Sequence, residues 1–132
     1  MALSLKKVLK LVSLYIRLYT FIMKLNEVIK ALELVSLHQN FDDVEVSDVY
    51  TSDLLSDVMG NAPDGCVLVT IQAHKNTLAV ATLKDFPGII ICNNRPVPED
   101  LLEAAIKERV GLFVTEKNQY KVSGLLFELL NG

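Results

Sequence analysis

Continuous apolar runs dominate the second half of the chain and indicate how it folds. Residues 66–71, 88–92 and 112–114 are apolar almost throughout, as strands buried on both faces are. Segments with helical spacing separate these runs. A strand, a helix and a second strand in that order form a right-handed parallel unit. We therefore predict an α/β fold in a single domain, with a mostly parallel sheet flanked by helices.

The first half carries shorter elements of the same kinds. Residues 34–37 form a brief apolar run, and residues 44–50 alternate between valines and polar residues, which predicts one half-buried strand. Ser52 and Asp53 offer an N-cap to the helix that follows them, and Asn76 or Thr77 offers one to the next. The predicted helices cover residues 24–34, 54–61, 75–86, 94–110 and 118–130.

The first 22 residues have a different pattern, that of a basic amphipathic helix. One face collects Lys6, Lys10, Ser13, Arg17, Thr20 and Lys24. The remaining surface collects Leu5, Leu9, Val12, Ile16, Tyr19 and Ile22. Such a helix lies on an anionic membrane or docks on a partner, whereas a membrane span would place Arg17 near its middle at a cost of roughly 2.5–3.5 kcal/mol.

Two interpretations of this extension stay open. Either residues 1–22 form an added amphipathic helix, or translation begins at Met23 and the preceding residues are an artefact of gene assignment. In both cases we expect a boundary between an extension of residues 1–22 and an α/β domain of residues 23–132.

Composition and charge narrow the possible functions. The chain has 132 residues, 51% of them hydrophobic, which suits one domain. Residues 1–24 hold five basic and no acidic side chains, so the rest carries a net charge of −8 against −3 for the whole. An acidic domain disfavours nucleic-acid binding. Cys66 and Cys92 lie in apolar runs without metal-binding spacing, which predicts buried, reduced thiols, a cytoplasmic protein and no metal or cofactor.

Polar residues follow each predicted strand. The carboxyl ends of parallel strands meet at one edge of a sheet, where α/β proteins bind ligands. Helix amino termini add oriented N–H groups there, which suits a phosphate or carboxylate. The candidate ligand-binding residues are Ser52, Asp53, His74, Lys75, Asn76, Asn93, Asn94, Arg95 and Lys117.

Catalytic signatures are sparse. The sequence has no G-x-x-x-x-G-K-S/T, G-x-G-x-x-G or G-x-S-x-G motif. An enzyme hypothesis therefore depends on His74 as an acid–base group beside Lys75, in a small transferase or hydrolase.

Three blocks, TSDLLSDVM, GCVLVTIQAHKNTLAVATLKDFPGIIICNNRPVPEDLLEAA and YKVSGLLFELL, together resemble the DRTGG domain family from about Met23 to Leu130. Stand-alone members are often labelled as serine kinases of the phosphocarrier HPr, and others lie between CBS domains in regulatory pyrophosphatases. The family's Asp-Arg-Thr-Gly-Gly letters are absent here, and Ala73-His74-Lys75-Asn76 stands where relatives carry a Gly-Asp-Arg-like turn. The resemblance implies a self-associating α/β regulatory module, with adenine nucleotides as ligands.

We therefore predict a non-catalytic regulatory module that forms a homodimer and binds a nucleotide or phosphorylated metabolite at the carboxyl edge of its sheet. The alternative is an adaptor that binds another protein through apolar surface and needs no small ligand.

Overall fold

The structure is a computed structural model that describes residues 3–20 and 23–131, without the side chains of residues 16–20. It has six helices within the described residues: α1 (Leu5–Thr20), α2 (Leu25–Ala31), α3 (Leu55–Asn61), α4 (Lys75–Leu83), α5 (Glu99–Glu108) and α6 (Gln119–Asn131). Its strands are β1 (Met23–Lys24), β2 (Val35–Ser36), β3 (Glu45–Val46), β4 (Val49–Thr51), β5 (Val67–Thr70), β6 (Gly88–Ile91) and β7 (Gly111–Val114).

Five strands form the central sheet, in the order β2-β7-β6-β5-β4. The four strands from β4 to β7 are parallel, and β2 joins β7 in the antiparallel direction. The register aligns Leu68 with Ile89 and Ile89 with Leu112. The predicted α/β fold with a mostly parallel sheet is therefore confirmed.

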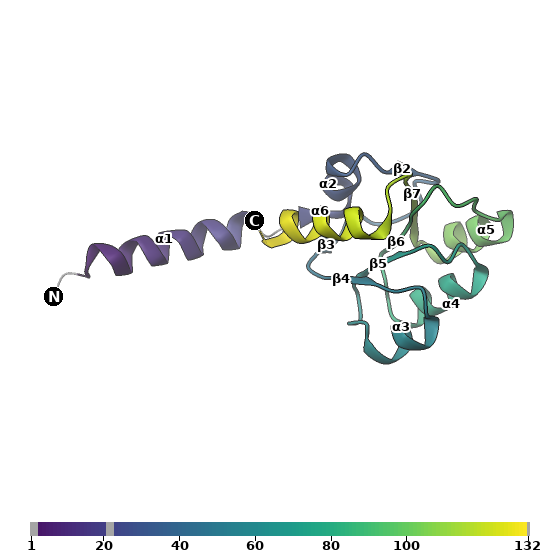
Figure 1. Cartoon of the computed structure of the whole chain (residues 1–132), viewed down its shortest axis with the longest axis horizontal. Coiled ribbons are helices and arrows are strands. Elements are labelled where there is room, and N and C mark those ends of the chain that lie inside the picture. Colours follow the sequence, from purple (N-terminus) through teal and green to yellow (C-terminus); the bar gives the residue numbers. More distant parts are fainter. Residues whose placement is uncertain (1–2, 21–22, 132) are drawn as a thin grey trace.

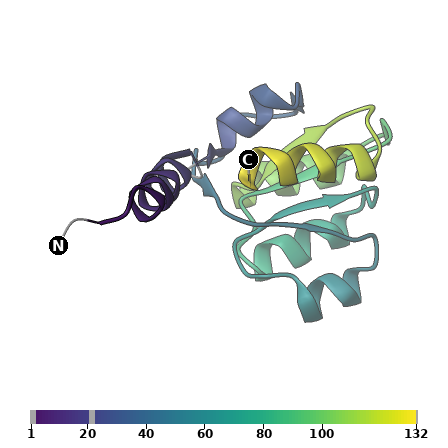
Figure 2. The same cartoon turned by 60° about the vertical axis from the view of Figure 1, so that its left-hand side comes forward.

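Helices cover both faces of this sheet, which explains why its strands are apolar along their length. Helices α3, α4 and α5 pack on the face that carries Leu68, Ile89 and Leu112. Helices α2 and α6 pack on the opposite face, over Ile90 and Phe113. Figure 2 shows α6 on one side of the sheet and α3 and α4 on the other.

Two glycines begin neighbouring strands because an aromatic ring occupies the space beside them. A Cβ atom at Gly111 would lie 2.5 Å from Cζ of Phe113, and one at Gly88 would lie 2.8 Å from Cε2 of the same ring. Phe113 is fully buried, and Phe41 packs edge-on against it with ring centroids 5.4 Å apart. The sheet is therefore tightly packed at the edge where β6 and β7 begin.

The prediction of one strand over residues 44–50 is wrong. The segment forms two strands that belong to different sheets: β3 pairs with β1 in an antiparallel ribbon, and β4 pairs with β5. The break falls at Ser47 and Asp48, which are exposed. The Asp48 carboxylate accepts a hydrogen bond from the N–H of Val49, and its carbonyl accepts one from Val67.

Two predicted helix caps are also wrong. Leu54 occupies the N-cap position of α3, and neither Ser52 nor Asp53 caps that helix. His74 caps α4, because its Nδ1 accepts a hydrogen bond from the N–H of Asn76 at 3.0 Å.

Helix α1 extends away from the sheet in both views (Figures 1 and 2). Its helical conformation agrees with the predicted extension, but Lys24, which was predicted on its basic face, lies in strand β1. Ile22 and the side chains of residues 16–20 lie outside the described part. Across residues 3–20 and 23–131, no helix combines the length and the apolar character that a transmembrane span requires.

Candidate ligand site at the carboxyl edge of the sheet

Strands β4 to β7 end at the same edge of the sheet because they are parallel. Seven of the nine predicted site residues lie in the loops that follow them, and Lys75 and Asn76 are the first two residues of α4. We call this side the carboxyl edge and the side where these strands begin the amino edge.

The turn after β6 is the most unusual backbone at the carboxyl edge. Asn93 and Asn94 both have positive φ angles, of 60° and 50°. Asparagine adopts this left-handed conformation more readily than most residues, because its short side chain tolerates it. The N–H of Asn93 donates to the carbonyl of Lys117 at 3.0 Å, and that of Asn94 donates to Thr115 at 2.8 Å. These bonds fix the turn to the β7–α6 loop and leave both asparagine side chains exposed.

Asp53 joins three elements at the same edge. Its Oδ1 accepts hydrogen bonds from Thr70 Oγ1 at 3.0 Å and from the N–H of Ile71 at 2.9 Å. Its Oδ2 accepts one from Nε2 of Gln119, the first residue of α6, at 3.0 Å. Asp53 therefore fastens the β4–α3 loop to the end of β5 and the start of α6.

These contacts also set the ionisation of Asp53. Burial acts to raise the pKa of its carboxyl, but the three hydrogen bonds outweigh burial and hold that pKa below its ordinary value. The positive charge of the Arg95 guanidinium lowers the same pKa further. An ionised Asp53 with a basic neighbour is thus part of the edge.

The His74-Lys75-Asn76 segment forms the start of α4. The Nδ1 atom of His74 is the cap, and among the described residues its Nε2 has no hydrogen-bond partner. Lys75 lies in a groove of about 360 Å³ that it shares with α5, where Asp100, Glu103 and Glu108 add negative charge. Lys107 lines the same groove, so Lys75 lies in a groove of mixed charge that does not include the Asn93–Asn94 turn.

Two other predicted residues serve the fold. The Ser52 hydroxyl accepts a hydrogen bond from the N–H of Leu54 at 3.2 Å. The Lys117 ammonium donates to the carbonyl of Leu32 at 3.2 Å, just beyond the last turn of α2. Lys117 also lines a groove of about 290 Å³ together with Asn94.

The nine residues thus share an edge without sharing one cavity. Asn93, Asn94, Arg95, Asp53 and Lys117 lie along the β4, β6 and β7 ends, whereas Lys75 lies in a separate groove. Within the described chain, five of the side chains make no hydrogen bond or ion pair, namely Lys75, Asn76, Asn93, Asn94 and Arg95.

Gln119 is a site residue that the sequence did not reveal. Its Nε2 donates to Asp53, while its Oε1 is buried and has no hydrogen-bond partner in the described part of the chain. A buried acceptor of this kind suits a water molecule or a ligand N–H group. The only signal in the sequence was its position at the start of the predicted helix 118–130, beyond the predicted strand 112–114. That position does not distinguish Gln119 from other residues at helix starts.

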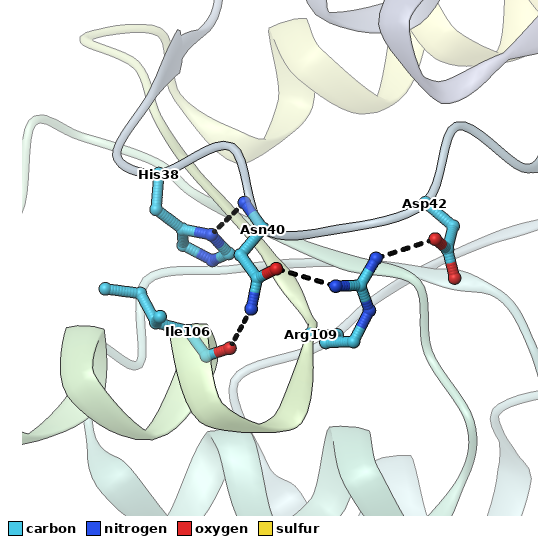
Figure 3. Close-up of polar contacts among 5 residues, drawn as sticks. All are labelled: His38, Asn40, Asp42, Ile106 and Arg109. Carbon is cyan, nitrogen blue, oxygen red and sulfur yellow. Dashed lines mark hydrogen bonds and ion pairs between the residues drawn. The ribbon is translucent and has the colours of Figure 1, made fainter.

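A second polar cluster occupies the amino edge (Figure 3). His38 uses both ring nitrogens: Nδ1 accepts from the N–H of Asn40 at 3.0 Å, and Nε2 lies 2.8 Å from the carbonyl of Val110. The Asn40 amide donates to the carbonyl of Ile106 at 2.7 Å and accepts from Arg109 at 2.6 Å. Arg109 also pairs with Asp42 at 2.8 Å. No local sequence pattern indicates this cluster, because the bonds between its two segments join residues 66 to 72 positions apart.

Both cysteines are free and buried, as predicted. Burial raises the pKa of each thiol to about 11, so both are protonated near neutral pH. No group of three or more His, Cys, Asp or Glu side chains suited to a metal ion is found in the described chain.

A groove of about 510 Å³ lies away from the predicted residues, between the edge strand β4 and α6. Asp48, Thr51 and Ser123 form its polar part, and Leu126 and Leu130 its apolar part. Phe127 borders it with 71% of its surface exposed.

No protein-family model matches the sequence, and no curated protein matches it. Among solved structures, the chain is similar to the CBS and DRTGG domains of the regulatory region of Clostridium perfringens pyrophosphatase, complexed with the activator diadenosine tetraphosphate. The TM-score is 0.62 at 12% sequence identity, over 81% of this chain and 46% of that one. The chain thus spans less than half of that solved structure. The likeness shows the fold and agrees with the resemblance to the DRTGG domain.

Proposed function

We propose that the chain is a non-catalytic regulatory module that binds a small anionic ligand, an adenine nucleotide, at the carboxyl edge. The observation that carries this proposal is the left-handed Asn93–Asn94 turn, which presents two amides beside Arg95. Backbone in such conformations clusters at ligand-binding sites, because the surrounding structure must hold it in place. The solved structure of similar fold is a regulatory region bound to a dinucleotide activator, which supports the choice of adenine nucleotides.

The neighbouring groups fit such a ligand chemically. Arg95 offers planar, paired N–H donors that match a phosphate, and exposed amides accept or donate to a base or ribose. His74 is occupied as a helix cap through Nδ1, so no observation favours the transferase or hydrolase hypothesis.

The test is thermal unfolding of the full chain with AMP, ATP, diadenosine tetraphosphate and inorganic phosphate. A ligand at 100 times its Kd stabilises the folded state by about 2.7 kcal/mol, which is readily measured. We expect Arg95→Ala to abolish the nucleotide-dependent shift. Arg109→Ala is the matched control, since it removes the same charge from the opposite end of α5 and leaves the shift intact.

Two results would overturn the proposal. One is the absence of a shift with every nucleotide and with phosphate at low and physiological salt. The other is an equal loss of the shift in Arg95→Ala and Arg109→Ala, which would place the ligand elsewhere.

We propose further that the module self-associates through the groove between β4 and α6. An edge strand and an exposed aromatic side chain beside an apolar groove are typical of a surface that a partner covers. Light scattering of the full chain measures the oligomeric state. Phe127→Asp should produce monomers, whereas Tyr120→Asp, on the same helix and 88% exposed but outside the groove, should not.

The same groove supports the second candidate, an adaptor that binds another protein. A monomer that binds no nucleotide, together with a Phe127-dependent interaction, would favour that function over the first.

A further inference from the structure

Helix α1 displays a broad apolar surface that the proposed ligand site does not use. Between 39% and 74% of each side chain is exposed at Leu5, Val8, Leu9, Leu11 and Val12. With 3.6 residues per turn, these five positions span about 160° of the helix circumference. Lys6, Lys7 and Lys10 occupy the opposite side. Arg17 continues the basic series in the sequence, and the helix contains no acidic residue.

We propose that α1 binds the surface of an anionic lipid bilayer, lying parallel to it with the leucine and valine face inserted. A helix with one wide apolar face and a basic polar face is the usual form of an interfacial membrane anchor. Its lysines extend their apolar stems along the helix and place their ammonium groups among lipid phosphates. The absence of a helix able to span a bilayer, among the residues described, agrees with this orientation.

A second copy of α1 fits this surface less well. A two-stranded coiled coil buries a narrow stripe, and an apolar arc of about 160° leaves much of its surface in water in such a pair. A bilayer interface covers the whole arc.

The groove between β4 and α6 is also a poor partner for α1. Strand β4 is three residues long, whereas the 16 residues of α1 form a rod of about 24 Å. Docking the apolar face into that groove would also turn Lys6 and Lys10 away from the acidic domain. Charge attraction would then contribute little.

The acidic domain does not prevent membrane binding by α1. Residues 25–132 carry a net charge of −8 and are repelled by an anionic surface. That repulsion is screened beyond about 8 Å at physiological salt, and α1 extends away from the sheet (Figures 1 and 2).

Flotation of the full chain with lipid vesicles tests the proposal. We expect binding to vesicles that contain phosphatidylserine, weaker binding to pure phosphatidylcholine, and partial release by added salt. Lys6→Gln and Lys10→Gln should each weaken binding to the anionic vesicles about fivefold.

A matched pair of leucine substitutions tests the orientation. Leu9→Gln should weaken partitioning at least about tenfold, because Leu9 lies on the apolar face. Leu14→Gln makes the same change between Lys7 and Lys10 on the basic side and should alter binding by less than about twofold. Both side chains are more than half exposed, so neither change is expected to affect folding of the domain.

The chain contains no tryptophan, so a single one reports its own surroundings. Val12→Trp emission should shift to the blue when anionic vesicles are added, and Ser13→Trp emission should stay close to its value in water. Failure to bind anionic vesicles, or equal loss in Leu9→Gln and Leu14→Gln, would overturn the proposal. A third result would also overturn it, namely that Val12→Trp emission is already shifted to the blue without vesicles and the chain is oligomeric. If adding Leu9→Gln then removed both the shift and the oligomer, a second copy of the chain would be covering α1. None of these outcomes depends on nucleotide binding at Arg95.

Discussion

Each edge of the sheet carries a His-x-Asn segment, and the two segments differ in how many of their polar atoms are hydrogen-bonded. The segments His38-Gln39-Asn40 and His74-Lys75-Asn76 each use a histidine Nδ1 to accept the N–H two residues later, at 3.0 Å in both. At the amino edge, the histidine's other nitrogen and the asparagine amide also have partners. At the carboxyl edge, both lack partners among the described residues. Similar local chemistry is thus fully hydrogen-bonded in one segment, whereas the other keeps a ring nitrogen and an amide without partners among the described residues.

The largest expected effect tests how tightly the amino edge is packed. Gly111→Ala should lower the free energy of unfolding by about 3 kcal/mol, because the new methyl group would overlap the buried Phe113 ring. Gly124→Ala in α6, with no atom within 4 Å of the added Cβ, should instead stabilise by about 0.5–1 kcal/mol. Urea denaturation measures both. Similar stability of the two variants would show that the Phe113 ring can shift to accommodate the added methyl group.

At the carboxyl edge, the main structural contact is Asp53. Asp53→Asn should cost about 2–3 kcal/mol at neutral pH, because an amide cannot accept the same three hydrogen bonds. The exposed Asp64, paired with Lys84 at 3.3 Å, gives a control of much smaller effect as Asp64→Asn.

The effect at Asp53 depends on pH in a defined direction. The folded state lowers the pKa of this carboxyl, so its stabilising contribution is complete above the unfolded value near 3.8. That contribution is lost as the pH falls through the lower, folded pKa. The stability difference between the parent chain and Asp53→Asn should therefore be constant at neutral pH and shrink in acid. A difference that grows below pH 4 would contradict this role.

The two histidine-x-asparagine segments allow the most direct comparison. Asn40→Ala removes a bond to Ile106 and one from Arg109 and should cost about 1–2 kcal/mol. Asn76→Ala removes an exposed amide and should change stability by less than about 0.5 kcal/mol. Thermal unfolding of both variants measures the difference, and equal losses would mean that Asn76 has structural partners too.

The last comparison concerns the reaction rates of the two thiols, one near each edge, and the small difference that a ligand should make between them. Cys66 precedes β5 and Cys92 follows β6, and burial raises both pKa values to about 11. We expect each to react with a disulfide reagent at pH 8 at least about a hundredfold more slowly than in the unfolded chain. Single-cysteine variants separate the two rates. A nucleotide at the carboxyl edge should slow Cys92 more than Cys66, and an unchanged ratio would argue against a ligand there.

Much of the fold was predictable because strands that are buried on both faces appear in the sequence as continuous apolar runs. Residues 66–71, 88–92 and 112–114 are apolar in both alternating positions, so neither their strand character nor their parallel order depended on distant contacts. The failure at residues 44–50 has the opposite cause. The alternation there is real, but Val46 packs with α2 and α6, whereas the register of Val49 is set by β5.

The site was predictable only as a location. Strand order places all nine residues at one edge, but it does not say which are already bonded. Asp53 and Lys117, predicted as ligand-binding residues, form hydrogen bonds with Gln119 and Leu32, which lie 66 and 85 residues away. Such pairings depend on the folded arrangement of distant segments, so no local pattern reports them. The fully bonded cluster around Arg109 was missed for the same reason.

The small ribbon of β1 and β3 has a consequence for how this domain can be joined to others. Met23 pairs with Val46, and residues 47–49 line one groove with Asn131, so β1 and the end of α6 lie near the same corner of the sheet. Figures 1 and 2 both show the end of α6 close to the end of α1. A unit built this way can be spliced into a surface loop of a larger protein without forcing the host strands apart, or circularly permuted with a short linker. Insertion into another protein would therefore require little change in either structure.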